Sequence, residues 1–386
     1  MSFDFDECVP RRGTGCEKYD GLLQRFGRAD LQPFWVADMD FRSPGCVREA
    51  LAGLVEHGVY GYALKTEATY RAICEWFARR HATRVDPASI VFTPGVVAAL
   101  NCLVQAFTAP GEGILIQPPV YHPFFSAVRG NDRRLLENPL IEQDNRYQMD
   151  YGDLEAKARD AKLLILCSPH NPVGRVWTRR ELERVADICL RHGVRIVSDE
   201  IHNDLVFPPH RHVPLASLAP EVARITITCH APSKTFNLPG LGTAYVLIPD
   251  EGLRATFRGF MDRLHVDNLN VFGLRALEAA YTAGEPWLEA LLAYLSGNAC
   301  RVREHLAAWA RVRLSPLEGT YLMWMDFREY RMPPEDLRRA LVERAGLALN
   351  DGRMFGAGGA GFQRLNIGCP RACLAQGLDR LKTALG

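Results

Sequence analysis

The chain has 386 residues, of which 47% are hydrophobic, so it is long enough for one large domain with a sizeable core and a smaller second domain. Its 46 basic and 45 acidic residues nearly balance, which argues against a nucleic-acid-binding or membrane-surface role. The first residues lack the basic start and apolar core of a secretory signal, and no apolar run approaches the roughly 20 residues that span a bilayer. We therefore expect a cytoplasmic protein.

The eleven cysteines are scattered along the chain, and no two of them form a Cys-x-x-Cys pair. An odd total with this spacing predicts neither a disulfide framework nor a zinc site.

Six short apolar runs predict buried β-strands. They cover residues 90–93, 113–117, 162–168, 195–199, 225–229 and 243–248. Helical spacing lies between them, most clearly at 178–192, where Thr178 and Glu181 fit a capping box and Gly193 fits a C-terminal stop. Continuous apolar strands that alternate with helices predict an α/β domain whose mainly parallel sheet is covered on both faces.

The pattern changes after residue 267 and predicts a smaller α+β domain. Helices are expected at 268–283, at 287–311, from Pro333-Pro334 and from about Pro370, with strands at 319–327 and 362–367. The first forty-odd residues are expected to complete this domain. We thus predict a large domain at 46–285 and a small domain formed by 1–45 and 286–386.

Three polar residues follow the ends of three predicted strands. Asn171 follows the strand at 162–168, Asp199 ends the strand at 195–199, and Lys234 follows the strand at 225–229. Ligands of open parallel sheets bind beyond the carboxyl ends of the strands. A lysine that can form a Schiff base, a carboxylate that can pair with a pyridine nitrogen and an amide near both predict a pyridoxal-phosphate (PLP) site.

Each of these residues also has a plainer interpretation. Lys234 could be a surface lysine in a turn, and Asn171 lies in a turn sequence. Asp199 could cap a helix or bind a metal with Glu200 and His202, although no further ligands are spaced to complete such a site. The three residues together, in this order, favour the cofactor.

Other motifs support the same site. Tyr121 follows a predicted strand and can stack on a cofactor ring. The turn at Gly95 leads into an apolar helix, whose free N–H groups suit a phosphate. Arg364 alternates with apolar residues and is either a surface residue or a carboxylate clamp. The G-x-G-x-x-G run at 356–361 precedes a strand rather than a helix, which predicts a loop and not a dinucleotide site.

These motifs resemble the PLP-dependent fold-type I aminotransferase family, and more narrowly its C–S β-lyase branch, which includes cystathionine β-lyases and a modulator of the maltose system. The segments that carry the resemblance are 34–41, 57–62, 198–202 and 365–371. The resemblance implies a mainly parallel seven-stranded sheet in the large domain, and a homodimer with shared active sites.

The resemblance also implies roles for single residues. Lys234, Asp199 and Tyr121 would be catalytic: Lys234 would hold PLP, Asp199 would pair with the ring nitrogen and Tyr121 would stack on the ring, while Asn171 would bind the ring hydroxyl. The further cofactor-binding residues implied are His202, Gly95, Val96, Val97, Ser233 and, from a second subunit, Tyr60. The substrate-binding residues implied are Arg364, Asn171, Ala37 and Trp35.

Two positions bear on the choice between the lyase branch and the aminotransferases. Aminotransferases of the family usually carry an arginine eight residues after the lysine, where this chain has Gly242, and the lyase branch also lacks it. Lyase relatives often have a serine three residues before the lysine, where this chain has Ala231. The first position favours a lyase, and the second removes one phosphate contact.

The function that the resemblance implies is α,β-elimination of L-cystathionine or a related S-substituted L-cysteine to pyruvate, ammonia and a thiol. An aminotransferase with the same residues and a 2-oxo acid acceptor is the first alternative. A PLP-binding regulator that acts through protein contacts is the second.

Overall fold

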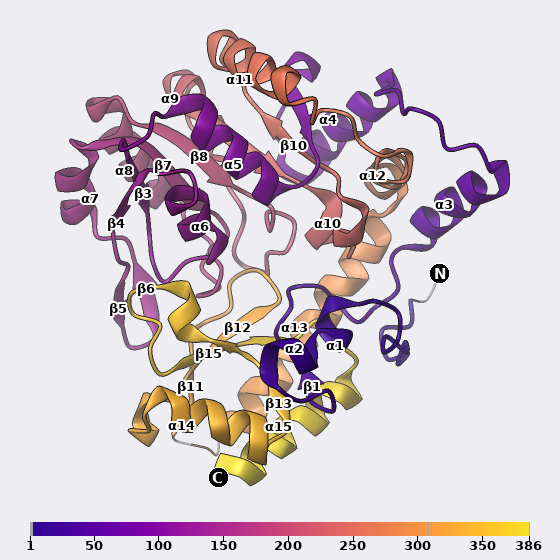
Figure 1. Cartoon of the computed structure of the whole chain (residues 1–386), viewed down its shortest axis with the longest axis vertical. Coiled ribbons are helices and arrows are strands. Elements are labelled where there is room, and N and C mark those ends of the chain that lie inside the picture. Colours follow the sequence, from indigo (N-terminus) through magenta and orange to yellow (C-terminus); the bar gives the residue numbers. More distant parts are fainter. Residues whose placement is uncertain (1–2, 308, 310, 386) are drawn as a thin grey trace.

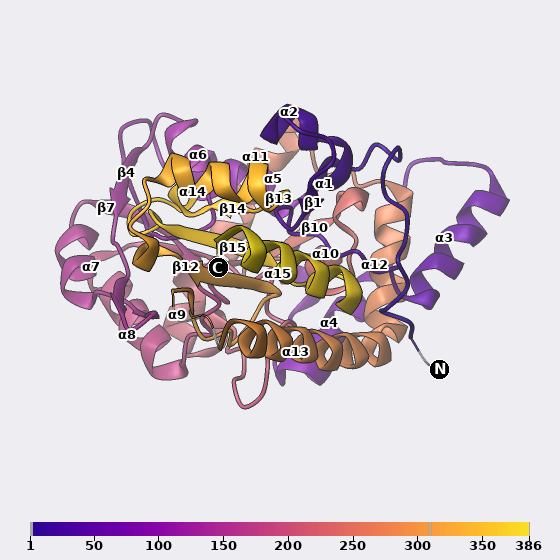
Figure 2. The same cartoon turned by 90° about the horizontal axis from the view of Figure 1, so that it is seen from below.

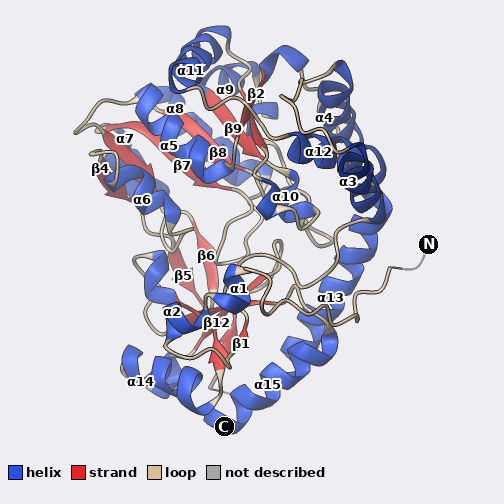
Figure 3. Cartoon of the chain, turned by 45° about the vertical axis from the view of Figure 1, so that its right-hand side comes forward, coloured by secondary structure: helices blue, strands red, loops and turns tan. Residues whose placement is uncertain are grey.

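The computed structural model describes residues 3–307, 309 and 311–385. Two lobes lie one above the other in Figures 1 and 3, and the larger lobe is built on a seven-stranded sheet of order β2-β10-β9-β8-β7-β3-β4. Its strands are β2 (Ile90–Thr93), β3 (Gly113–Ile116), β4 (Arg134–Glu137), β7 (Ala161–Cys167), β8 (Arg195–Asp199), β9 (Thr226–His230) and β10 (Ala244–Leu247). Only β10 in this sheet is antiparallel to its neighbours, so the predicted mainly parallel sheet is confirmed.

Helices cover both faces of this sheet. Side chains of α5 (Val96–Phe107), α6 (Pro123–Arg129) and α11 (Glu251–Leu264) share one core with it. The helices of the opposite face are α7 (Tyr151–Ala158), α8 (Arg179–His192) and α9 (Pro220–Ile225), with α4 (Glu67–His81) and α12 (Val271–Ala283) over its β2 end. The predicted capping box of α8 is present, since Thr178 accepts from the Glu181 backbone N–H and Glu181 accepts from that of Thr178.

The smaller lobe contains a four-stranded antiparallel sheet of order β11-β12-β15-β14 (Figure 2). Its strands are β11 (Arg313–Leu314), β12 (Leu322–Asp326), β14 (Asn350–Asp351) and β15 (Phe362–Asn366). The helices α13 (Glu285–Ala307), α14 (Pro334–Arg339) and α15 (Arg371–Leu385) follow the predicted pattern. The predicted helix at 287–311 is shorter than expected, and residues 308 and 310 lie outside the described part.

The N-terminal segment belongs spatially with the C-terminal third of the chain. Its strand β1 (Gln32–Pro33) pairs in parallel with β13 (Leu347–Ala348), and its helices α1 (Glu17–Asp20) and α2 (Leu22–Phe26) lie beside the small lobe in Figure 1. The first long helix, α3 (Gly45–His57), follows this segment and packs against α12.

The glycine-rich run at 356–361 forms a loop. The run at 356–361 is a turn with positive φ at Gly356, Gly358 and Gly361 that leads into β15, so the predicted loop is confirmed. Within residues 3–307, 309 and 311–385, no helix combines the length and apolarity needed to cross a membrane. The same residues contain no cluster of three or more His, Cys, Asp or Glu suited to a metal ion.

Candidate active site

The three strand-end residues meet at the carboxyl edge of the large sheet. The ends of β7, β8 and β9 are level, because Cys167 pairs with Asp199 and Asp199 with Cys229. Lys234 follows β9 on the short helix α10 (Pro232–Thr235). A cavity of about 230 Å³ lies at this edge and is lined, among the predicted residues, by Ala37, Gly95, Val96, Val97, Tyr121, Asn171, Asp199, His202, Ser233 and Lys234.

Lys234 lies between this cavity and two neighbouring ones. Its Nζ donates a hydrogen bond of 2.6 Å to the Ala37 carbonyl oxygen. The pKa of Lys234 is lowered to about 8, because burial and the Arg364 charge outweigh the opposing effect of Asp38 and Asp199. The neutral amine, which a nucleophilic or basic lysine requires, is therefore far more populated near neutral pH than in an exposed lysine.

Asp199 is a buried carboxylate, only 3% exposed, that forms no ion pair with the described residues. Its Oδ1 accepts one hydrogen bond, from the Ile201 backbone N–H at 3.2 Å. Burial raises the pKa of Asp199 to about 7. A buried carboxylate with so little compensation is stabilised by a cation in the cavity, so the site fits a group with a protonated ring nitrogen.

Arg364, on β15, is a buried cation in the wall of the site. Its guanidinium donates to Asn171 Oδ1 (3.0 Å), to the Trp35 carbonyl (2.8 Å) and to Asn350 Oδ1 (2.6 Å). Burial lowers the pKa of Arg364 to about 10, and none of its described partners is a carboxylate. An arginine fork without an anionic partner fits a substrate carboxylate.

Asn350 is a site residue that the sequence did not reveal. It stands opposite Arg364 in the pairing of β14 with β15 and is 4% exposed. Nothing in its local sequence marks it, because its role depends on a pairing between two strands. Thr243 and His122 also line the cavities without having been predicted.

Tyr121 and His202 lie on the walls of the cofactor-sized cavity. Burial raises the pKa of Tyr121 to about 12, so its phenol stays protonated. Burial lowers the pKa of His202 well below its usual value, and its ring is therefore neutral. Its Nδ1 is buried without a hydrogen-bond partner in the described part of the chain, which leaves this atom available to a ligand.

The turn at Gly95 delivers the start of α5 to the same cavity, with Ser233 nearby. The first backbone N–H groups of a helix have no partner within the helix, so they suit a phosphate. Ala231 and Gly242 line this cavity as well. Gly242 has a φ of +54°, a conformation that disfavours a longer side chain there.

Tyr60 lies away from this chain's own cavities. It is 55% exposed, and its ring lies 5.2 Å from that of Phe272. Trp35 does reach the site: it lines the second cavity, and its Nε1 donates to the Lys18 carbonyl at 2.9 Å.

The second cavity, of about 570 Å³, shares Ala37, Tyr121 and Lys234 with the first. Its apolar wall consists of Phe26, Trp35, Val36, Leu341, Val342, Leu347, Leu349 and Met354. Charged side chains also line it, namely Glu17, Arg25, Arg338, Asp351 and Arg364. A substrate held at Arg364 and Lys234 thus has room for a large substituent.

Comparisons with known proteins place this architecture in a family. The model of the class I and II aminotransferases matches residues 47–381. The chain is 44% identical to cystathionine β-lyase PatB of Bacillus subtilis (99% of this chain, 100% of the relative) and 39% identical to protein MalY of Escherichia coli (99% of each).

Solved structures agree with these matches. Cystalysin from Treponema denticola, which contains PLP, superposes with a TM-score of 0.97 at 34% identity (100% of this chain, 99% of that one). The PLP-bound C–S lyase of Staphylococcus hominis superposes with a TM-score of 0.94 at 31% identity (100% and 98%). The chain belongs to the class I and II aminotransferase family, within its cystathionine β-lyase branch, and the predicted membership and fold are confirmed.

Proposed function

We propose that the protein is a PLP-dependent C–S β-lyase that cleaves L-cystathionine or a related S-substituted L-cysteine into a thiol, pyruvate and ammonia. The observation that carries the proposal is the meeting of Lys234, whose pKa is lowered to about 8, with the uncompensated carboxylate of Asp199 in one cavity. The names of PatB, cystalysin and the Staphylococcus hominis lyase support the same chemistry.

The residues around the first cavity would hold the cofactor. Lys234 would bind it covalently, Asp199 would pair with its ring nitrogen and Tyr121 would stack on its ring. Because Asn171 Oδ1 accepts from Arg364, the Nδ2 amide remains as the donor to the ring hydroxyl. The phosphate-binding groups would be Gly95, Val96, Val97 and Ser233, with His202 beside the ring.

The substrate would lie between the two cavities. Arg364 would bind the α-carboxylate, helped by Asn171 and the Ala37 backbone, and Trp35 would form part of the pocket wall. PLP, when bound, supplies an aldehyde for the amine and a ring that withdraws electrons from Cα. Neutral Lys234 Nζ would take the Cα proton, after which the Cβ–S bond breaks with its electrons on sulfur.

An apolar exposed segment supports the proposed homodimer. Large hydrophobic side chains face solvent at Val55, Val59, Tyr60, Tyr62 and Leu64. Exposed apolar clusters of this kind mark interaction surfaces. A second copy that covers this segment would receive Tyr60 at its phosphate site. We also propose that the dimer is cytoplasmic, on its nearly balanced charge of 46 basic and 45 acidic residues.

The decisive experiment measures pyruvate release from L-cystathionine by the PLP-loaded protein, with and without a 2-oxo acid. We expect release without the acceptor and loss of release in Lys234→Ala. Turnover that requires the acceptor would identify an aminotransferase. PLP binding without either reaction would favour the regulatory alternative.

A further inference from the structure

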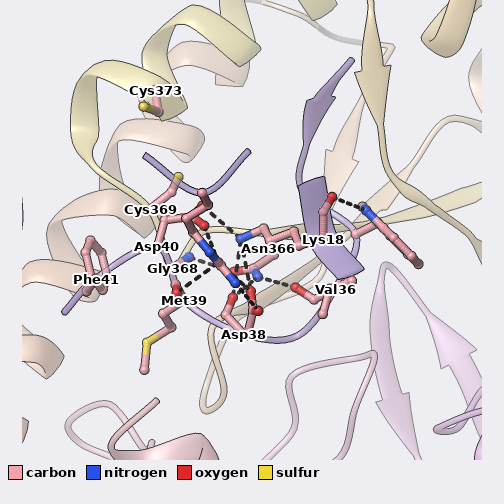
Figure 4. A network of polar contacts seen from close by, with 12 residues as sticks. Lys18, Val36, Asp38, Met39, Asp40, Phe41, Asn366, Gly368, Cys369 and Cys373 are labelled. Atoms are coloured by element: carbon pink, nitrogen blue, oxygen red, sulfur yellow. Dashed lines mark hydrogen bonds and ion pairs between the residues drawn. The ribbon is translucent and has the colours of Figure 1, made fainter. Parts of the chain in front are cut away.

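A buried charge cluster lies where the N-terminal segment meets residues 36–40 (Figure 4). Arg11, Asp38 and Asp40 of this cluster line one of the cavities that Lys234 also lines. Lys18 Nζ lies 2.8 Å from Asp40 Oδ2 and 3.5 Å from Asp38 Oδ1. Arg11 approaches the same two carboxylates, at 2.6 Å each. Two cations therefore face two anions, and the cluster is neutral as a whole.

The cluster is too deeply buried to be an ordinary surface ion pair. Lys18 is 1% exposed and Asp40 is 6% exposed. Burial alone would lower the pKa of Lys18, but the carboxylates of Asp40 and Asp38 outweigh it, so the lysine stays charged. Arg11 and Lys18 in turn hold the pKa of Asp38 below its usual value, although burial acts to raise it. Removal of one charge from such a cluster leaves a buried excess charge.

The same groups fix the backbone on both sides of Ala37. The Lys18 carbonyl accepts from Trp35 Nε1, and Lys18 Nζ donates to the Asp38 carbonyl at 3.4 Å. Asn366, on β15, donates to the carbonyls of Val36 and Asp38, at 2.6 Å each. Figure 4 shows the segment from Val36 to Phe41 curved around the Asn366 side chain. Ala37 is thus held from both ends.

The Ala37 carbonyl oxygen is the atom through which this backbone segment contacts Lys234. It accepts a hydrogen bond of 2.6 Å from Lys234 Nζ and one of 2.7 Å from the Tyr321 hydroxyl. We propose that Lys18 and Arg11 are positioning residues for Lys234: they hold the Ala37 carbonyl against its Nζ and neutralise Asp38 beside it. The inference rests on the proposed PLP-dependent function, but it concerns how the lysine is tuned rather than which bond is cleaved.

Several titratable and charged groups face Lys234, and the test must leave all of them except Asp38 unchanged. Asp199 faces it from the end of β8 and Arg364 from β15, while Asp38 faces it from the N-terminal segment. The neutral ring of His202 and the protonated phenols of Tyr121 and Tyr321 complete the surroundings. Among these, only Asp38 is paired with Lys18 and Arg11.

Two substitutions should therefore act on Lys234 in opposite directions. Lys18→Met keeps most of the side-chain volume but leaves the two aspartates with one cation, so the excess negative charge favours a protonated Lys234 nitrogen. Asp38→Asn leaves an excess positive charge and disfavours it. We expect the titration midpoint of the Lys234 nitrogen to shift by about 0.5–1 pH unit, upward for Lys18→Met and downward for Asp38→Asn.

The experiment is a pH titration of the visible absorbance of the PLP-loaded protein, which reports the protonation of the Lys234 nitrogen without any turnover. Lys157→Met removes a lysine paired with Asp153 on α7 and is the matched control, with an unchanged midpoint. Where Lys18→Met does not fold, Arg11→Gln replaces it and should shift the midpoint upward as well. A purely structural role predicts unchanged midpoints, and that result, or shifts of equal sign, would overturn the proposal.

The titration separates this inference from the proposed function. Wild-type protein without a cofactor band would refute the PLP site itself. A normal wild-type titration with unshifted variants would refute only the positioning role. As a second readout, kcat for pyruvate release should fall more than about fivefold in Lys18→Met, with a smaller change in KM, because the substrate carboxylate clamp is intact.

Discussion

Arg364 Nη1 donates a 3.0 Å hydrogen bond to Asn171 Oδ1, and this bond joins the two lobes of the molecule. Arg364 belongs to β15 of the small lobe, while Asn171 follows β7 of the large lobe. The proposed substrate clamp and the proposed cofactor donor are therefore one connected unit. A substitution of either residue should therefore alter the function of the other.

We expect Arg364→Lys to lower kcat/KM for L-cystathionine by about 100-fold, mainly through a higher KM. An ammonium cannot reproduce the fork that binds a carboxylate while also holding Asn171 and Asn350. Steady-state kinetics of pyruvate release measure this. A loss confined to kcat would show that Arg364 does not bind the substrate carboxylate.

The shared hydrogen bond predicts non-additive effects at the same pair. In a double-mutant cycle of Asn171→Ala and Arg364→Ala, we expect a coupling free energy of about 0.5–3 kcal/mol in kcat/KM. Additive losses would mean that the two residues act independently.

Asp199 should destabilise the protein when no cofactor is bound. Its pKa is raised from 3.8 to about 7, so the folded protein binds more protons than the unfolded chain between these pH values. The penalty is absent below pH 3.8, grows as the pH rises and is complete above about pH 7. Asp199→Asn should therefore raise the stability of the cofactor-free protein above pH 7, by about 2–4 kcal/mol.

Urea unfolding at pH 5 and pH 8 tests this prediction, since the gain should be larger at pH 8. The same substitution should reduce the stabilisation that added PLP confers, because the ring nitrogen loses its counter-ion. Equal stability of the two cofactor-free proteins at pH 8 would contradict the account.

Much of the site could be predicted because its signals are local. Asp199 ends a buried apolar strand, and Asn171 and Lys234 each follow one, so a short stretch of sequence shows both the strand and the polar residue at its end. The family resemblance then supplied the roles of Tyr60 and Ala37, which no local pattern indicates. The residue roles and the domain boundaries stay predictions.

What the sequence did not reveal depends on contacts between distant segments. Asn350 gains its role only through the pairing of β14 with β15. Lys18 is a lysine in a polar stretch, and nothing local tells that it is 1% exposed. Strand β4 was missed because it lies at the sheet edge, is only partly buried and has charged residues, Arg134 and Glu137, at both ends.

The large second cavity predicts selectivity by size. Met354 lines its wall and is 44% exposed, so a larger side chain there should narrow the pocket without disturbing the core. Met354→Trp should lower kcat/KM for L-cystathionine more than about tenfold, with little effect on the small substrate L-cysteine. Ile141→Trp, at an exposed strand position outside the cavities, is the matched control. Equal losses of kcat/KM for both substrates would show that the sulfur substituent of L-cystathionine does not lie in this cavity.

The proposed dimer makes a prediction that only a shared site can satisfy. Tyr60 is exposed and lies outside its own chain's cavities, so its hydroxyl would serve the other subunit. Lys234→Ala protein should be inactive, and Tyr60→Ala protein should be nearly inactive at a limiting PLP concentration. In a mixed dimer of the two, one site carries both substitutions and the other carries neither. Equal mixing and random reassociation should therefore restore about a quarter of the wild-type pyruvate release. Mixtures that stay inactive, although mass analysis shows mixed dimers, would mean that Tyr60 acts within its own chain. Full activity of Tyr60→Ala protein would mean that Tyr60 does not serve either site.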